Sequence, residues 1–393
     1  MPSTLLEKEL IEAIAKTYGT PVYVYSREEI LKRISTVKYV FSSVNLFPTF
    51  ACKANNNPRI IEIFKDNGFG ADIVSIGEYH ACKLADVDDK KIVWNGNGKT
   101  RKEIEILSKK VGYVNIDSEE EYEIWSEIDS SAEFFLRVNP DVDAKTHPHI
   151  STGLKKSKFG IQTDEIDRIL SKKRLNISGF HVHIGSQITD VEPFEEAISK
   201  VVDLSKKYGF SKINIGGGWG IKYKDKELDI LEYKERIVPY LKDFKMVILE
   251  LGRYLIAPAG LLVLKVEYVK KTRHKTFVVL DGGMNVLMRP AMYNAYHEIN
   301  VLDPESSEKY IIDVVGPLCE SGDIIAFERN LEIPKVGSYV IVRDVGAYGY
   351  SMSNNYNSMP RPAEVIVYEE NGKYDFRLIR RREEIEEMFK TIV

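Results

Sequence analysis

The chain has 393 residues, of which 44% are hydrophobic and 29% are charged, and its formal net charge is −4. This composition is typical of a folded protein with room for two domains, and the near balance of charges argues against a nucleic-acid partner. Three scattered cysteines, Cys52, Cys82 and Cys319, exclude a disulfide framework, and no CxxC pair indicates a structural zinc site. We therefore expect a small-molecule partner and no metal.

The first residues, MPSTLLEKELIEAIAKTYG, mix acidic and apolar side chains, which predicts an amphipathic helix and not a signal peptide. No apolar run approaches the roughly 20 residues that cross a bilayer. The sequence thus predicts a cytoplasmic protein with no membrane partner. The next run, PVYVYS at 21–26, predicts a strand that joins a later β domain.

Residues 45–251 alternate short β-rich runs with helical patterns. Five helix candidates have apolar residues three and four apart, and several end in glycine: 57–68, 100–112, 118–128, 163–173 and 192–209. The predicted strands are 47–53, 70–75, 91–96, 113–118, 133–138, 177–184, 212–217 and 245–251. Eight βα units over about 200 residues favour a TIM-type (β/α)₈ barrel over an open sheet.

After Gly260 the pattern changes to β-rich runs with little helix between them. These runs are LLVLKVEYVKK, KTFVVLDGG, YIIDVVG, SYVIVRDVG and AEVIVYEE, which predict a mostly antiparallel β domain. We therefore expect an α/β fold in two domains, a barrel over 27–260 and a C-terminal β domain over 261–393, with residues 1–26 contributing a strand to the second.

Unusual polar residues fall at the ends of the predicted barrel strands, where TIM barrels build their active sites. Lys53 ends the first strand, His183 the sixth, residues 216–218 (GGG) the seventh and Glu250 the eighth. Lys53, inside the apolar run FACKANNNP, is either a surface lysine at a strand end or a Schiff-base amine with a lowered pKa. The glycines either bring backbone amides close to an anion or form a flexible turn.

Three further positions have two interpretations each. His181 and His183 are two apart and share a face if the strand is regular, as a packed core pair or as part of a site without a third metal ligand. Glu250 either pairs with Arg253 or faces a cationic ring nitrogen. Cys319 in GPLCESGD is either inert packing or a reactive thiol.

Together, the motifs FACKAN, HVHIGSQ, GGGWG, ELGR, GGMNVLMRPAMY, GPLCESGD and GAYGYSMSNNYN resemble those of the fold-type III pyridoxal-phosphate (PLP) decarboxylases, which have an alanine racemase-like barrel. They are most similar to the members that act on diaminopimelate. The resemblance spans roughly residues 20–390. Two departures, Leu251 for the family's usual Pro and Met359 in SMPRP, remove no charged group.

The resemblance implies a PLP cofactor and assigns residues to it. Lys53 would bond covalently to the cofactor, His183 would stack on its ring and Glu250 would pair with its ring nitrogen. Glycine amides and Ser186 would hold its phosphate. The other residues implied at the cofactor are Asp72, Arg137, Gly216, Gly217, Gly218, Gly252, Arg253 and Tyr348.

The resemblance also implies substrate residues and a homodimer. Cys319 would donate a proton, and Glu320 would bind the distal amine of the substrate, both from the other subunit. The distal carboxylate region would contact Arg253, Arg289 and Tyr293, and Tyr348 would touch both cofactor and substrate.

The implied reaction is the decarboxylation of meso-2,6-diaminopimelate to L-lysine and CO₂, the last step of lysine biosynthesis. The second carboxylate and second ammonium of that substrate suit two arginines and a glutamate. The alternatives are a decarboxylase of ornithine, lysine, arginine or carboxynorspermidine, a racemase, a non-catalytic PLP-binding homologue, and a sugar-phosphate barrel enzyme without PLP. Substrate comparison, CO₂ release and borohydride trapping on Lys53 discriminate among them.

Overall fold

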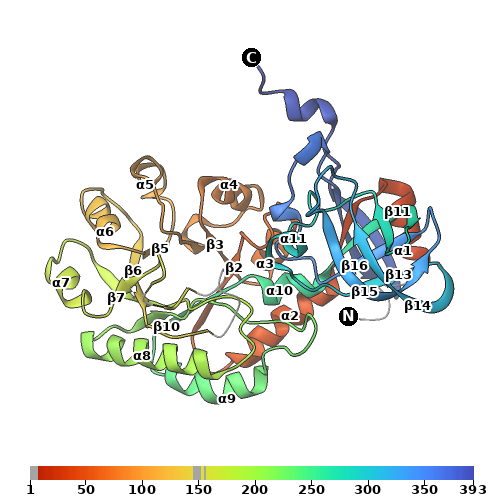
Figure 1. The fold of residues 1–393 in the computed structure, drawn as a ribbon. Coiled ribbons are helices and arrows are strands. Elements are labelled where there is room, and N and C mark those ends of the chain that lie inside the picture. The colour runs from red at the N-terminus through yellow and green to blue at the C-terminus, as the bar shows by residue number, and fades with distance from the viewer. Residues whose placement is uncertain (1–7, 145–151, 155) are drawn as a thin grey trace. The chain divides into compact units, whose positions relative to one another are not determined.

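The computed structural model describes residues 8–144, 152–154 and 156–393 (Figure 1). The chain divides into two compact units. The barrel unit comprises Ile34–Lys222 and Lys226–Leu255, and the β-rich unit comprises the residues up to Arg33, Tyr223–Asp225 and Ile256–Val393. No helix among the described residues has both the length and the hydropathy to span a membrane.

Eight parallel strands close into the predicted barrel. Their order is β5-β4-β3-β2-β10-β9-β8-β6, and the ring closes because β5 also pairs with β6. Short β7 (Ile161–Gln162) adds to β6. The eight barrel strands are β2 (Leu46–Ala51), β3 (Gly70–Ile73), β4 (Ile92–Trp94), β5 (Tyr113–Ile116), β6 (Glu133–Asn139), β8 (Ile177–His181), β9 (Lys212–Asn214) and β10 (Met246–Leu251).

Helix α2 precedes the first barrel strand, the other helices follow barrel strands, and the helices lie outside the strands (Figure 1). Local sequence signals set several of their ends. The Asn57 side chain caps α3, Thr100 and Glu103 form a capping box on α5, and Gly209 ends α8 with a left-handed φ of 73°. The helices are α2 (Arg27–Val40), α3 (Pro58–Asp66), α4 (Ile76–Leu84), α5 (Arg101–Leu107), α6 (Glu119–Ser126), α7 (Ile166–Ser171), α8 (Glu192–Tyr208), α9 (Ile230–Leu241) and α10 (Arg253–Ile256), with the 3₁₀ turn η2 (Asp89–Lys91).

The β-rich unit is built on one mostly antiparallel sheet, as predicted. Its main path is β15-β14-β12-β11-β1-β17-β18, and β16 pairs with β11 and β13. Only the β1–β17 and β12–β14 pairs are parallel among its described pairings. Its strands are β1 (Val22–Ser26), β11 (Gly260–Lys271), β12 (Thr276–Leu280), β13 (Ile299–Val301), β14 (Pro304–Val315), β15 (Ile324–Pro334), β16 (Tyr339–Arg343), β17 (Ala363–Glu370) and β18 (Lys373–Arg380).

Two helices accompany this sheet. Helix α1 (Lys8–Tyr18) lies where an amphipathic helix was predicted, and the earlier residues of that prediction lie outside the described ones. Its buried Ile11 and Ile14 join a core with Val22, Val24 and Val365. The remaining helical segments are α11 (Arg289–Tyr293), η4 (Ala257–Ala259), η5 (Tyr350–Met352), η6 (Tyr356–Ser358) and η7 (Ile385–Phe389).

The sequence did not predict β13, β15 or β18. Strand β18 (KYDFRLIR) lies at a sheet edge, and four of its eight residues are exposed, so no apolar run marks it. Charged and amide side chains interrupt β15 in the same way, at Glu328, Arg329 and Asn330. Both strands form because neighbouring strands supply their hydrogen bonds, and a single-sequence pattern does not contain that information.

The barrel interior is layered, and this layering positions the candidate site. Val93, Phe135 and Ile248 form a buried apolar cluster with Tyr113 nearby. Side chains two residues apart on a strand share a face, so the next inward positions are polar: Asn95, Asn115, Arg137 and Glu250. The carboxyl ends of the strands therefore carry a buried polar layer above an apolar one.

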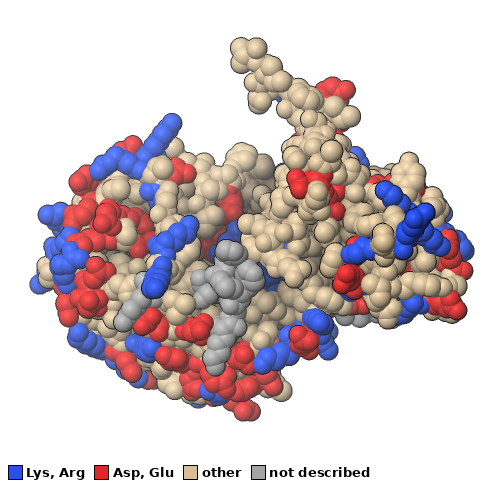
Figure 2. Space-filling view, in the orientation of Figure 1, with Lys and Arg blue, Asp and Glu red and all other residues tan. Residues whose placement is uncertain are grey.

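The surface charges are mixed in sign. On the face drawn in Figure 2, Lys and Arg side chains alternate with Asp and Glu across the barrel unit. Arg236, for example, contacts Glu192, Glu195 and Glu232. Such exposed pairs contribute little stability individually, but they leave this face without a broad patch of one sign.

Candidate active site

A cavity of about 290 Å³ opens at the carboxyl ends of the barrel strands. Five predicted site residues from five different strand ends line it: Lys53, Asp72, Arg137, His183 and Glu250. Convergence of one amine, one imidazole and two carboxyls in a single cavity is the usual mark of a functional site. The other lining residues are Val74, Asn95, Gly96, Asn97, Thr152, Phe159 and His181.

The charge of the Lys53 ammonium acts on the other ionisable groups of this cavity. It follows β2 directly, and its side chain is exposed while Cys52 and Ala54 on either side are buried. Burial raises the pKa of Asp72 and lowers that of His183, and the Lys53 charge lowers both pKa values. The structure thus favours the interpretation of Lys53 as a rim amine facing the cavity.

Three asparagine side chains hold the Glu250 carboxylate, and we call them the amide belt: Asn95, Asn115 and Asn214. Their Nδ2 atoms donate to Glu250 Oε1 at 2.9, 2.8 and 2.6 Å respectively. Nε2 of His181 lies 3.3 Å from the other oxygen, Oε2. Each amide comes from a different strand, at the end of β4, in β5 and at the end of β9.

The amide belt is continuous across the barrel. Asn115 Nδ2 donates to Asn95 Oδ1 at 2.7 Å, and Asn214 Nδ2 lies 3.3 Å from Asn115 Oδ1. At one end Asn95 donates to Asp72 at 2.6 Å, and at the other Asn214 Oδ1 accepts from the Gly216 amide at 3.0 Å. The belt therefore connects both carboxyls to the glycine loop.

The two carboxyls of the cavity have opposite protonation states. Burial alone would raise the pKa of Glu250, but His181, Asn214 and Asn95 together hold that pKa well below its ordinary value. Burial and the Glu250 charge raise the pKa of Asp72 to about 8. The surroundings of Asp72 therefore favour its protonated form, whereas the contacts of Glu250 favour its ionised form.

Both histidines reach the cavity, although β8 ends at His181 and His183 lies beyond it. Burial, with the charges of Lys53 and Arg137, lowers the pKa of His183 well below its usual value, so its imidazole is neutral at pH 7. The Gly217 amide donates to His183 Nδ1 at 3.2 Å, which puts the ring proton on Nε2. No group of three or more His, Cys, Asp or Glu within the described ranges is placed to hold a metal.

Arg137 is a buried cation that orders one wall. Its Nη1 lies 3.1 Å from Asp117 Oδ1, and its guanidinium stacks 4.5 Å from the centre of the Phe159 ring. Nη2 donates to the His183 carbonyl at 3.5 Å, and Thr152 Oγ1 donates to the same carbonyl at 2.8 Å. Arg137 therefore positions the backbone that carries His183.

The glycine loop after β9 requires glycine for its backbone path. Gly216 and Gly218 have φ of 61° and 111°. A Cβ on Gly217 would lie 1.8 Å from the Glu250 carbonyl, and one on Gly218 would lie 2.3 Å from the Gly185 carbonyl. Besides the His183 contact of Gly217, the Gly216 amide is bonded to Asn214. Two of the three amides therefore already have protein acceptors.

The Ser186 hydroxyl and the Arg253 guanidinium form hydrogen bonds with each other in the barrel unit. Arg253 Nη2 and Nε donate to Ser186 Oγ at 3.0 and 3.3 Å, and Arg253 is buried. Gly252, just before it, would bring a Cβ within 2.9 Å of the Ala54 Cβ, next to Lys53. The Ser186 hydroxyl keeps its own proton to donate, so the pair suits a phosphate or a carboxylate.

The other predicted residues lie in the β-rich unit, where the side chain of Arg289 is oriented by His297. Arg289 is buried at the start of α11, and its Nε donates to His297 Nε2 at 3.2 Å. His297 Nδ1 lies 2.8 Å from the Arg343 carbonyl, so Nδ1 carries the proton and Nε2 accepts. Tyr223 packs against both side chains. Tyr293, at the last position of α11, is half-buried.

Cys319 and Glu320 lie exposed on an ordered loop. The Cys319 amide donates to Asn357 Oδ1 at 3.0 Å, and its thiol is free. Asp323, which the sequence grouped with them, is buried and accepts the amides of Met284 and Leu318 at 2.6 and 2.8 Å. Asp323 therefore shapes the loop, while Cys319 and Glu320 remain accessible for chemistry.

Tyr348 has a left-handed φ of 58°, which is uncommon for a bulky residue. Glycines on both sides allow the tight path: a Cβ on Gly346 would lie 2.0 Å from the Ile256 carbonyl, and one on Gly349 would lie 2.4 Å from the Val345 carbonyl. Backbone strain of this kind is concentrated at functional sites.

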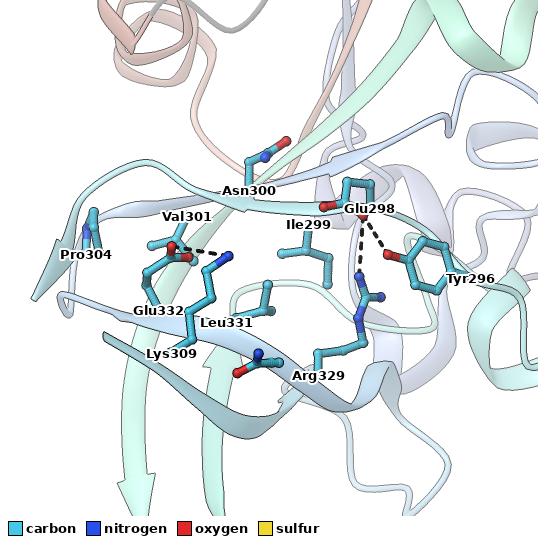
Figure 3. A pocket seen from close by; sticks show the side chains of 11 residues that line it. Tyr296, Glu298, Ile299, Asn300, Val301, Pro304, Lys309, Arg329, Leu331 and Glu332 are labelled. Carbon is cyan, nitrogen blue, oxygen red and sulfur yellow. Dashed lines mark hydrogen bonds and ion pairs between the residues drawn. The ribbon is translucent and has the colours of Figure 1, made fainter. Parts of the chain in front are cut away.

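A second cavity, of about 430 Å³, lies among β13, β14 and β15 of the β-rich unit (Figure 3). Its charged side chains face one another. Tyr296 donates to Glu298 at 2.6 Å, Arg329 lies 3.8 Å from Glu298, and Lys309 lies 3.6 Å from Glu332 (Figure 3). Because these charges neutralise each other, the barrel cavity is the stronger candidate site.

The residues of the barrel cavity fit PLP. Lys53 offers a primary amine for an aldehyde, Glu250 is a buried carboxylate suited to a cationic ring nitrogen, and His183 offers a neutral ring for stacking. His181 Nδ1 is buried without a hydrogen-bond partner in the described structure, so a polar group remains to be satisfied there. Ser186 and Arg253 add the donors that a phosphate needs.

Known proteins support the same interpretation. The family described as "Pyridoxal-dependent decarboxylase, pyridoxal binding domain" matches residues 27–257. The chain is 41% identical to diaminopimelate decarboxylase of Aquifex aeolicus, over 96% of this chain and 93% of that one.

Two solved structures are similar over nearly the whole chain. Diaminopimelate decarboxylase from Helicobacter pylori, complexed with L-lysine, has a TM-score of 0.89 at 35% identity and covers 96% of this chain and 98% of its own. The Methanocaldococcus jannaschii enzyme, also complexed with L-lysine, has a TM-score of 0.88 at 37% identity and covers 98% of this chain and 94% of its own. This chain therefore belongs to the family of pyridoxal-dependent decarboxylases.

Proposed function

We propose that the chain decarboxylates meso-2,6-diaminopimelate to L-lysine and CO₂, with PLP bound through Lys53. The observation that carries the proposal is the cavity that Lys53, Glu250 and His183 line together. Near-full-length identity of about 40% to diaminopimelate decarboxylases supports the substrate. The direct test is an assay of CO₂ and L-lysine with the purified protein, PLP and meso-diaminopimelate.

The chain's residues divide the work of binding the cofactor. PLP, when bound, supplies an aldehyde and an electron-accepting ring, while the protein supplies orientation and electrostatics. Lys53 would hold the cofactor through its aldehyde, and neutral His183 would pack against its ring. Ser186 and Arg253 hold the phosphate together with the glycine loop, 216–218, and Gly252 lets this wall approach Lys53. Asp72 and Arg137 set the field around the amine.

Glu250 provides the main electrostatic effect. Because the surroundings of Glu250 favour its ionised form, its carboxylate would favour a protonated ring nitrogen and so help to stabilise negative charge that develops on the substrate. The amide belt keeps the Glu250 carboxylate in place through three hydrogen bonds. Of its members, only Asn95 lines the cavity. The groups around the carboxylate then need not reorient as the charge develops on the substrate. Preorganisation of this kind is often the largest single contribution to the rate enhancement.

Residues of the β-rich unit recognise the substrate and finish the reaction in this proposal. Arg289, oriented by His297, binds the distal carboxylate together with Tyr293. Glu320 binds the distal ammonium, Tyr348 contacts cofactor and substrate, and Cys319 Sγ supplies the proton that replaces the lost carboxylate. Cys319 and Glu320 act from the second subunit of a homodimer.

Replacing Arg289 by Gln should weaken diaminopimelate binding selectively. Loss of a charged hydrogen-bond pair corresponds to a rise in KM of roughly 10- to 100-fold, with a smaller effect on kcat. Selectivity over ornithine should fall by a similar factor, since ornithine has no distal carboxylate. Steady-state kinetics with both substrates measures this change.

Arg377→Gln is the matched control for that variant. Arg377 is an exposed arginine of the same unit on β18, and its loss should leave both KM values as in the parent. If Arg289→Gln leaves the KM for diaminopimelate unchanged, or if the parent prefers ornithine, lysine, arginine or carboxynorspermidine, the substrate assignment is wrong.

Shared active sites predict complementation between two inactive variants. Co-expressed Lys53→Ala and Cys319→Ala chains should form mixed dimers in which one of the two sites has both residues. With random pairing, activity should recover to roughly a quarter of the parent value. The measurement is kcat per protomer of the co-purified mixture. Activity no greater than that of the two variants assayed separately would show that Cys319 serves its own subunit or none.

Three other classes of protein would give different experimental results. A racemase would interconvert stereoisomers without releasing CO₂, and a PLP-binding homologue without activity would hold the cofactor and turn over nothing. A sugar-phosphate barrel enzyme would leave no pyridoxyl group on Lys53 after borohydride reduction. Labelling at Lys53 together with CO₂ release is expected only of the decarboxylase.

A further inference from the structure

Two of the three cysteines meet inside the wall of the barrel. Cys52 follows β2 and Cys82 lies in α4, 30 residues further along the chain. Their Sγ atoms are 3.6 Å apart, and both side chains are fully buried. The reaction proposed above uses neither thiol.

We propose that Cys52 and Cys82 are a modification site at which a hydroperoxide forms a disulfide, and that this bond fastens the Lys53-bearing end of β2 to α4. A disulfide needs an S–S distance of about 2.0 Å, so the sulfurs must approach by roughly 1.5 Å. Rotation about the Cα–Cβ bonds can supply such a shift.

A disulfide between Cys52 and Cys82 would connect two neighbouring parts of the barrel wall. The Cys52 amide donates to the Asp72 carbonyl at 2.9 Å, so Cys52 is tied to β3 and is adjacent to Lys53. Cys82 accepts backbone hydrogen bonds from Ala85 and Val87 at the end of α4. A link between them would join consecutive βα units and close a 30-residue loop, which restricts the unfolded chain.

The chemistry balances with peroxide as the two-electron oxidant. One thiol is first oxidised to a sulfenic acid as the peroxide O–O bond breaks and one water leaves. The second sulfur then attacks the sulfenic sulfur, its proton leaves with the hydroxyl as a second water, and the S–S bond forms. A small oxidant is required because neither sulfur is exposed. The contact with Cys82 and burial raise the pKa of Cys52, so the reaction should be slow.

The test uses PLP-loaded protein carrying Cys319→Ser, because Cys319 is the exposed thiol. After treatment with hydrogen peroxide, the protein is denatured in the presence of a thiol-alkylating reagent. The mass of the intact chain is then measured by mass spectrometry. We expect the mass of two hydrogens to be lost and no alkyl group to be added, whereas the reduced protein takes two. A peptide containing Cys52 joined to Cys82 should appear, and dithiothreitol should remove it.

Stability supplies the second readout. The oxidised protein should unfold at a temperature higher by on the order of 5 °C than the reduced protein. Cys52→Ala and Cys82→Ala in the same background should show no such rise after peroxide, and comparing each variant with itself removes the cost of the substitution. The proposal is overturned if both thiols remain alkylatable, if oxygen is added without a link, or if the linked protein melts no higher. None of these outcomes depends on catalysis, so the test is independent of the proposed function.

Discussion

Substituting Lys53 by Arg should abolish covalent PLP attachment and lower decarboxylase activity by on the order of 10⁴-fold. Arginine keeps the positive charge that acts on Asp72 and His183, but its guanidinium stays protonated and cannot bond to an aldehyde. The variant should therefore keep the fold and the field of the cavity while losing the bond. Absorbance of the bound cofactor and mass mapping after borohydride reduction measure the attachment.

Lys102→Arg is the matched control for Lys53→Arg. Lys102 is an exposed lysine of the same unit on α5, and its replacement should retain the label and the activity. A pyridoxyl group found on another lysine, such as the buried Lys99 that pairs with Glu121 at 2.8 Å, would remove the basis of the proposed site. A Lys53→Arg protein that stays labelled and active would do the same.

Replacing Glu250 by Gln should lower kcat by roughly 10²- to 10³-fold, the usual effect of removing one preorganised charge contact. Glutamine keeps the shape of the side chain, but it cannot favour a proton on a neighbouring ring nitrogen. Cofactor attachment through Lys53 should persist, so a normal borohydride label with a low kcat is the expected combination. Equal kcat values in the parent and the variant would contradict the role of Glu250.

A variant of the amide belt tests whether its hydrogen bonds keep the pKa of Glu250 low. Asn214→Leu removes one donor to Glu250 Oε1 from a residue that does not line the cavity. Fewer donors stabilise the charged form less, so the pKa of Glu250 should rise and the acid limb of the kcat/KM profile should move to higher pH. A structural defect alone would lower activity without moving that limb. Profiles of the parent and the variant over the acid range decide between these results.

Local patterns were sufficient for the barrel strands and for the residues at their ends. Each predicted strand exists, because short β-rich runs that alternate with amphipathic helices are typical of buried parallel strands, and the carboxyl ends of such strands meet on one rim. Lys53, His183 and Glu250 were found for that reason. Lys53 alone was ambiguous, and the coincidence of several polar residues at strand ends was the signal.

The same patterns did not predict the amide belt or the His297 contact. Asn95, Asn115 and Asn214 each have apolar neighbours in the sequence, and a buried asparagine in a strand is an unusual choice that could have drawn attention. Their common partner, Glu250 Oε1, is fixed only when four strands close into a ring. His297 likewise orients Arg289 only through the carbonyl of distant Arg343.

The sequence by itself therefore determined the element types, the barrel and the chemical groups available at its rim, because these depend on period, burial and residue type along short stretches. Tertiary structure alone decided which groups interact: the opposite pKa shifts of Asp72 and Glu250, the tautomers of His183 and His297, and the contact of Cys52 with Cys82. Each of these depends on a distance of a few ångströms between residues far apart in the chain. Hydrogen bonding and electrostatics act over that distance, and it is set only when the strands close.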